Sequence, residues 1–267
     1  MSMVVRPQSP GLAPFVRVIG YYEGEALPFR HERSLPDAGM SLMVNLHEDQ
    51  FRTYHGPDHG DVHRIGGAML MGPRTGHTVI DTAEQRAVLT VSFTLGGALP
   101  FLRLPLSEIR DQMIELEHIW GRDGAVLRER LCETATPERK MRVVEEVLLA
   151  HLAPPPRDPA VVFAARALER GADVSVVAAA LGLLPKQFVR RFRGHVGLTP
   201  KLFSRVRRLQ RLLRRVHGNG PADWAAVAVE HGYFDQAHLI NDFRALTGIT
   251  PGAYLAAVGG ERNHVPI

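Results

Sequence analysis

The first hundred residues alternate short apolar runs with Gly, Pro, Asp and His. Short runs rich in Val, Ile, Leu, Met and Phe, separated by turn residues, are typical of strands in a β-sandwich or barrel. Five runs have the length of a strand: residues 15–22, 41–46, 67–71, 77–80 and 87–93. The sequence therefore predicts a β-rich region here.

After Gly96 and Gly97 the pattern becomes helical. One short helix is expected at residues 107–113, and a longer one at residues 137–152, where apolar residues recur at helical spacing. We interpret residues 1–152 as a β-rich sandwich- or barrel-like domain that also contains helices.

The last third of the chain uses one template twice. Residues 197–203 (Gly-Leu-Thr-Pro-Lys-Leu-Phe) return 51 positions later as residues 248–254 (Gly-Ile-Thr-Pro-Gly-Ala-Tyr). Upstream of each copy lie an Asp, an Ala-rich apolar turn, a Gly and a helix with a Phe near its end. A repeat of this size indicates one supersecondary unit used twice, here helix, tight turn, helix.

Capping residues and apolar spacing predict where the helices of this repeat begin and end. We expect helices at about residues 160–170, 174–181, 186–195, 200–217, 224–231 and 235–246. The first should bury Phe163, Ala164, Ala167 and Leu168. The long fourth helix should bury Leu202, Val206, Leu209, Leu213 and Val216 and act as a rigid spacer between the two units. The fold class is therefore α+β, with an all-α C-terminal domain at residues 160–267.

Residues 153–159 (Ala-Pro-Pro-Pro-Arg-Asp-Pro) are the predicted linker, because Pro-rich segments favour extended, semi-rigid geometry. The charge balance changes sign at this point. Residues 1–156 contain 16 basic and 20 acidic residues, a net charge of −4, whereas residues 157–267 contain 16 basic and 8 acidic residues, a net charge of +8. Residues 186–215 contain 11 basic residues and no acidic one.

A basic surface of this kind attracts polyanions. Charge alone leaves DNA, RNA and anionic membrane open, and the repeated helix-turn-helix favours double-stranded DNA. The second helix of such a unit enters the major groove, where Arg and Lys suit guanine and Gln suits adenine. On that face the first unit presents Lys186, Gln187, Val189, Arg190 and Arg193, and the second presents Gln236, Ala237, Ile240 and Asn241. The Arg side chains of the spacer helix are expected either to contact phosphate or to be solvated.

The second unit resembles the AraC/XylS family of transcriptional regulators, whose motif reads G-[FY]-x-[DS]-Q-[SA]-[HY]-[FL]-x-x-x-F-[KR]-x-x-x-G-x-[ST]-P-x-x-[YF]. Residues 232–239 (Gly-Tyr-Phe-Asp-Gln-Ala-His-Leu) match it, as do Phe243-Arg244, Gly248, Thr250-Pro251 and Tyr254. The resemblance implies two helix-turn-helix units joined by one long helix. It also implies base contacts by Lys186, Val189 and Arg190 in the first unit and by Gln236, Ala237, Ile240 and Asn241 in the second. The N-terminal region is similar to the β-rich regulatory domains of a subgroup with Gly-Pro-Arg-Thr, here residues 72–75, and a Phe-x-x-Gly-Gly step, here residues 93–97. This resemblance implies that residues 1–152 are a regulatory, effector-binding or dimerisation domain.

Two alternatives to a regulator remain open. One is an enzyme fused to a DNA-binding domain, such as a DNA-repair alkyl acceptor or a β-barrel metalloenzyme. The other is an architectural DNA-binding protein. The single cysteine, Cys132, excludes an intrachain disulfide. His47, His55, His59 and His63 lie in sequence that resembles loops, so we expect no metal site, no cofactor and no catalysis. A small-molecule effector, RNA polymerase and a second copy of the chain are candidate partners. Neither a signal peptide nor a membrane span is expected, and the cytoplasm is the expected location.

Overall fold

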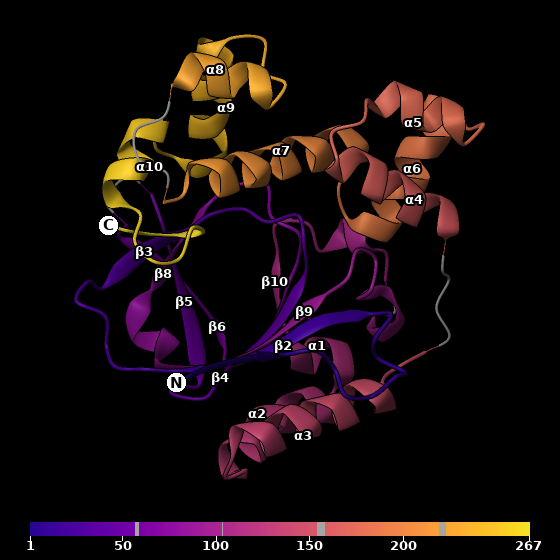
Figure 1. Ribbon diagram of the computed structural model, residues 1–267. Coiled ribbons are helices and arrows are strands. Elements are labelled where there is room, and N and C mark those ends of the chain that lie inside the picture. The colour runs from indigo at the N-terminus through magenta and orange to yellow at the C-terminus, as the bar shows by residue number, and fades with distance from the viewer. Residues whose placement is uncertain (57–58, 103, 154–157, 219–222) are drawn as a thin grey trace.

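The computed structural model describes residues 1–56, 59–102, 104–153, 158–218 and 223–267, with the side chains of residues 84 and 85 left aside. Strands dominate the regular structure of the first hundred residues, and helices that of the last hundred (Figure 1). The long helix α7 (Pro200–Val216) runs across one side of the β-sheets, with one small helical unit at one of its ends and the second toward the other end (Figure 1). The α+β fold class is confirmed.

The strands form two sheets, and all their described pairings are antiparallel. The six-stranded sheet has the order β1 (Ser2–Val5), β2 (Val16–Glu23), β9 (Ala87–Phe93), β4 (Ser41–Asn45), β7 (Ala68–Met71), β10 (Met113–Glu115). The five-stranded sheet has the order β11 (His264–Pro266), β3 (His31–Ser34), β8 (Thr78–Asp81), β5 (Gln50–His55), β6 (Asp61–Gly66).

The core of the N-terminal part lies on the central strands of the larger sheet. Leu42 of β4 is opposite Val91 of β9, and Val44 is opposite Leu89; all four are fully buried. Helices α1 (Leu116–Trp120), α2 (Arg122–Glu133) and α3 (Pro137–Ala150) add residues such as Leu127 to the same core. Alternating buried side chains on paired strands thus give the sheet one face that the helices cover.

All five predicted strands are present, and α3 confirms the longer predicted helix. The short helix predicted at residues 107–113 is wrong. A 3-10 turn at Leu106–Glu108 is followed by β10, and Asp111 between them has a φ of 56°. Backbone hydrogen bonds explain the difference, because the Gly72 amide bonds to the Gln112 carbonyl and the Asp111 amide to the Pro73 carbonyl. A short helix with a costly nucleus loses to this tertiary pairing.

The helical repeat is present as predicted. Its helices are α4 (Pro159–Glu169), α5 (Val174–Ala180), α6 (Pro185–Val196), α7, α8 (Trp224–Glu230), α9 (Gln236–Thr247) and α10 (Pro251–Ala257). Asp173 caps α5 and Asp223 caps α8, each through its carboxylate on two backbone amides. Gly197 and Gly248 end α6 and α9 with left-handed φ angles of 85° and 75°, a conformation that glycine adopts without steric cost.

Two of the predicted apolar stripes need correction. Phe163 on α4 is 51% exposed, and Val161 and Ala165 are buried in its place. On α7, Leu202 is only half-buried, and Phe203 and Leu212 join the core. The stripe of α7 is wider than predicted because a further face of the helix packs on the N-terminal part, where the Gln210 side-chain amide donates to the Pro36 carbonyl at 2.8 Å.

The hydrophobic core of the helical part also includes residues from outside it. Leu35 and Ala38 are buried together with the apolar residues of α4 to α10, and so is Val265 of β11. Strand β11 returns from the C-terminal end and pairs with β3, with His264 opposite Ser34. Of the predicted linker at residues 153–159, residues 154–157 lie outside the described residues. The division into residues 1–152 and 160–267 stays a proposal.

Candidate nucleic-acid interface

Helix α6 exposes every residue predicted to read DNA in the first unit. Phe188 and Phe192 are buried one turn apart and pack edge-on with ring centroids 5.7 Å apart. This fixes which face of α6 points outward. The residues exposed on it are Lys186, Gln187, Val189, Arg190 and Arg193.

The start of α6 is stabilised by one of these residues. The Leu184 amide donates to Oε1 of Gln187 at 3.3 Å, so the Gln187 side chain caps the helix in this structure. Arg191, which was not among the predicted site residues, turns to the other side and forms an ion pair with Asp158 at the start of α4. Burial alone would raise the pKa of Asp158, but hydrogen bonds from Arg191 and the Val161 amide, together with the Arg191 charge, lower it overall.

Helix α9 exposes three of the four residues predicted for the second unit. Leu239 and Phe243 are buried, which leaves Gln236, Ala237 and Asn241 exposed. Ile240, the fourth, is half-buried against the core. Asp235 caps the helix, with its carboxylate accepting from the His238 amide at 2.7 Å.

Asp242 of α9 is buried and bound to the spacer helix. Its carboxylate pairs with Arg205, and with Nη2 of Arg208 at 3.4 Å. The Arg208 guanidinium also lies 4.2 Å from the centre of the Tyr233 ring and donates to the Gly232 carbonyl. Burial, followed by the charge of Asp242, raises the pKa of Tyr233 to about 12. Neither of the expected alternatives, phosphate contact or free solvation, therefore describes Arg205 and Arg208 here; they attach α9 to α7.

Exposed apolar residues lie in the turns before both recognition helices. Leu184 precedes α6 and is 67% exposed, and Phe234 precedes α9 and is 89% exposed. Neither residue was among the predicted site residues. The sequence marks them only as apolar residues that lie in a turn.

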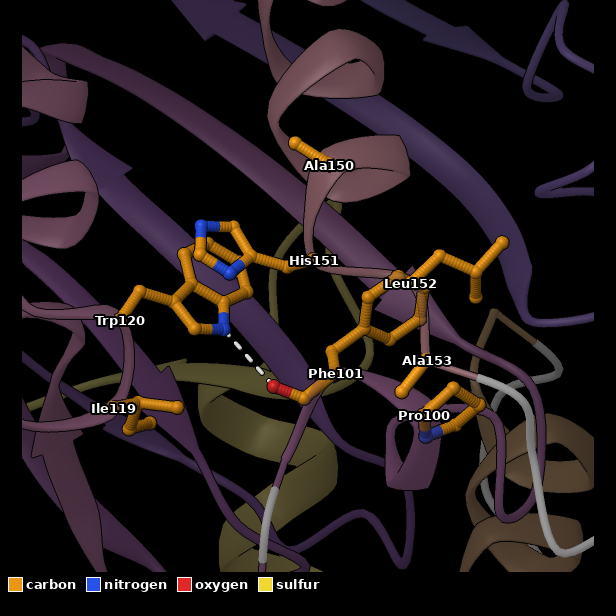
Figure 2. Close-up of a pocket in the computed structure, with 8 residues that line it drawn as sticks. All are labelled: Pro100, Phe101, Ile119, Trp120, Ala150, His151, Leu152 and Ala153. Atoms are coloured by element: carbon orange, nitrogen blue, oxygen red, sulfur yellow. Dashed lines mark hydrogen bonds between the residues drawn. The ribbon is translucent and has the colours of Figure 1, made fainter.

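A cavity of about 370 Å³ lies in the N-terminal part, between α1 and the end of α3 (Figure 2). Trp120 and His151 stack in it, with ring centroids 4.6 Å apart and an interplanar angle of 6°. The Trp120 indole donates to the Phe101 carbonyl at 2.9 Å, and His151 Nε2 lies 3.1 Å from Oδ2 of Asp123. Leu152 and Ala153 also line it, so the cavity adjoins the point where the chain leaves the N-terminal part.

The histidines interpreted as loop residues lie partly on strands. His55 ends β5 and His63 is in β6, opposite Thr53, so that loop interpretation is wrong for these two. Polar residues separate the apolar ones along both strands of this hairpin. It therefore contains no continuous apolar run that would mark a strand in the sequence. Within the described ranges, no group of three or more His, Cys, Asp or Glu residues is arranged to hold a metal ion. Among the described helices, none has the length and apolar content needed to cross a membrane.

Two family models match the chain. Residues 177–257 match a helix-turn-helix domain, and residues 4–115 match a domain of unknown function, DUF6597. No curated protein matches the chain significantly.

Solved structures of ToxT from Vibrio cholerae resemble the whole chain weakly. One ToxT structure is 8% identical, covers 96% of this chain and 98% of that one, and has a TM-score of 0.45. Wild-type ToxT bound to an unsaturated fatty acid is 11% identical, covers 90% and 95%, and has a TM-score of 0.42. At these values the likeness carries no conclusion about ligands. The helix-turn-helix match over residues 177–257 agrees with the paired units described above and with the resemblance of the C-terminal part to the AraC/XylS family.

Proposed function

We propose that the chain is a transcriptional regulator that binds specific double-stranded DNA with both recognition helices. The observation that carries the proposal is the repeated unit. In each copy the second helix is anchored by buried Phe or Leu and exposes its first turns. Side chains at the N-terminal end of such a helix reach base edges in the major groove.

The proposed base contacts follow from side-chain chemistry. Arg190 and Lys186 suit the O6 and N7 acceptors of guanine, and Gln236 and Asn241 suit adenine. Gln187 would have to give up its capping hydrogen bond to contact a base, so its base contact would weaken the start of α6. Ile240, being half-buried, would contribute at most an apolar edge against a thymine methyl.

The geometry of α7 supports contacts in two grooves. Its 17 residues span roughly 25 Å at 1.5 Å per residue, and α6 and α9 lie toward its opposite ends (Figure 1). Successive major grooves on one face of B-DNA are ~34 Å apart. We propose that one chain covers an asymmetric site of about two helical turns, because its two units differ and need no palindrome.

We further propose that the N-terminal part controls this activity, by binding a small molecule or by dimerisation. The cavity beside Trp120 and His151 supports the first alternative, because it combines an aromatic wall with a few polar groups and adjoins the route to the DNA-binding part. RNA polymerase as a partner and a cytoplasmic location belong to the same proposal. The enzyme alternative receives no support from Cys132, which is exposed and whose Sγ lies 3.9 Å from the Leu46 carbonyl oxygen, a contact that supplies no catalytic partner.

Selection from random DNA tests the function. The full-length chain should enrich a non-palindromic sequence with two blocks of preferred bases about one helical turn apart. Binding to that sequence should fall steeply with salt, because each neutralised phosphate adds about 0.9 to the slope of log K against log salt. Arg190→Ala should weaken binding to that sequence. Arg166→Ala removes the same charge at an exposed position of α4, away from the recognition helices, and serves as its control. Failure to enrich any sequence, with equal affinity for all DNA, would overturn the proposal.

A further inference from the structure

One loop of the N-terminal part contacts both helix-turn-helix units. Residues 72–77 connect β7 to β8 and include the Gly-Pro-Arg-Thr motif. A Cβ atom added to Gly197 would lie 2.6 Å from Cγ of Pro73, and one added to Gly248 would lie 2.8 Å from Nε2 of His77. These two glycines occupy the same position in the two copies of the repeat, 51 residues apart. The loop therefore touches the two units at equivalent points, the C-terminal ends of α6 and α9.

The loop is itself held firmly. The Thr75 amide donates to Asp111 at 2.6 Å, and the Thr75 hydroxyl donates to the same carboxylate. Gly72 lies so close to the Ile109 carbonyl that no side chain fits. The Gly-Pro-Arg-Thr motif thus builds a rigid loop, a role that explains its glycine and threonine.

Arg74 connects the loop to the segment beneath the spacer helix. Its guanidinium donates to the Ser34 carbonyl at 3.1 Å, the Ser34 hydroxyl at 3.0 Å and the Leu35 carbonyl at 2.8 Å. Burial lowers the pKa of Arg74 to about 10, although the charges of Asp37 and Asp111 oppose this. Buried cations are costly unless their donors are satisfied, and here several backbone and side-chain oxygens satisfy them.

The segment that Arg74 holds meets α7 directly. Leu35 is fully buried in the core of the helical part, and the Pro36 carbonyl accepts from Gln210. Nη1 of Arg207 lies 3.3 Å from Oδ1 of Asp37. Loop 72–77 is consequently connected to α6, α9 and α7, the three helices whose arrangement sets the distance between the two DNA-reading surfaces.

We infer that loop 72–77 positions the two recognition helices relative to each other, with Pro73 holding the first unit and His77 the second. This inference rests on the proposed DNA-binding function. The contacts lie at the C-terminal ends of α6 and α9, so they leave the first turns of both helices exposed. The N-terminal part acts here as a clamp that sets the spacing between two half-sites, and it does not cover the DNA-reading face.

The test is the dependence of DNA affinity on half-site spacing in the full-length chain. The double variant Pro73→Ala/His77→Ala removes both contacts, and Pro10→Ala/His118→Ala changes exposed residues of the same types elsewhere in the N-terminal part. The probe is the selected sequence, unchanged or with two base pairs inserted between its blocks, which moves the second block by about 7 Å. We expect the insertion to lower the affinity of the wild type and the control at least tenfold, and that of the double variant less than threefold.

Further arms separate positioning from general stability. His77→Gln keeps a flat polar side chain against Gly248, so the two-base-pair insertion should lower its affinity nearly as much as that of the wild type. His77→Ala alone should be less sensitive to the insertion. Thermal unfolding shows whether each variant is folded. If the double variant does not fold, the dependence of affinity on half-site spacing is measured with His77→Ala instead. An equal spacing penalty in wild type and loosened variants overturns the inference. Failure of the wild type to select any sequence instead overturns the proposed function.

Discussion

The two helix-turn-helix units share the Asp caps of their first helices and the Gly ends of their recognition helices but differ in the charge of equivalent positions. Arg191 of α6 and Asp242 of α9 occupy the same place, one residue before the buried Phe. Arg191 pairs with Asp158 of its own unit, whereas Asp242 pairs with Arg205 and Arg208 of α7. Both side chains hold their helix through ion pairs, but Asp242 is buried whereas Arg191 stays exposed. The charge of a recognition helix therefore divides into charge that holds the helix in place and charge that faces DNA.

After this division the units still differ. The exposed face of α6 carries Lys186, Arg190 and Arg193, and the exposed part of α9 carries Gln236, Asn241 and Arg244. Phosphate neutralisation provides much of the affinity for DNA, so the first unit should bind more strongly. The second unit should contribute selectivity more than affinity, since amide side chains read bases without adding charge.

The largest expected effect comes from the helix that the two units share. Leu209 of α7 is fully buried, and Leu209→Gly removes its side chain and adds a helix-weakening residue. We expect the free energy of unfolding to fall by about 3–6 kcal/mol. Arg214→Gly, at an exposed position of the same helix, should cost about 1 kcal/mol. Chemical denaturation measures both, and in footprinting both half-sites should lose protection together with Leu209→Gly. Retention of one fully protected half-site would show that the units are independent.

The inequality of the units is tested by truncating equivalent residues. Arg190 and Asn241 occupy the same position in the two copies. Arg190→Ala should weaken binding to the selected sequence by roughly 1–3 kcal/mol through loss of a bidentate base contact. Asn241→Ala should weaken it less. Titrations on the same DNA measure the two losses, and equal losses would contradict the inequality.

The inward role of Asp242 is tested through stability. Asp242→Asn keeps the shape of the side chain but leaves the half-buried Arg205 and Arg208 without their counter-charge. We expect the free energy of unfolding to fall by about 1–2 kcal/mol. DNA affinity, measured at a temperature where the variant is fully folded, should change little. Arg191→Gln at the equivalent position should cost less, because Arg191 is 44% exposed. A large loss of DNA affinity with no loss of stability would show that Asp242 acts at the DNA surface.

The smallest expected effect is a difference in acid stability. The pKa of Asp158 is lowered in the folded chain, so its contribution to stability is present above the ordinary Asp pKa of about 3.9 and is lost as the pH falls below it. Arg191→Gln removes the partner and should flatten this loss. Urea denaturation between neutral pH and about pH 3 measures the slopes. Identical slopes in wild type and variant would mean that the Arg191 pair does not depress the Asp158 pKa.

Much of the helical part was predictable because its signals are local. Asp173, Asp223 and Thr199 act as caps where the sequence places them, and the spacer runs from Pro200 to Val216, close to the expected bounds. Of the predicted site residues, all but Ile240 are exposed on the recognition helices. Ile240 differs because it lies on α9 at the border between the buried and the exposed face. Helical spacing alone locates that border only to within a residue.

The N-terminal part was predictable only where strands are apolar. Strands β3, β5 and β6 carry alternating polar residues, so their runs resemble loops. The region at residues 107–113 resembles a helix by spacing, but pairing with residues 72 and 73 imposes a turn and a strand. Long-range backbone pairing of this kind leaves no local trace in the sequence.

Residue spacing and capping chemistry alone settled the repeat, its helix ends and the outward face of each recognition helix, because these depend on residues within a few positions of each other. Only the packed structure decided which charges point inward, since Asp242 and Arg205 are 37 residues apart. It also decided that Pro73 and His77 meet equivalent glycines of the two units. Such contacts follow from how sheets and helices pack in three dimensions, and no spacing along the chain encodes them.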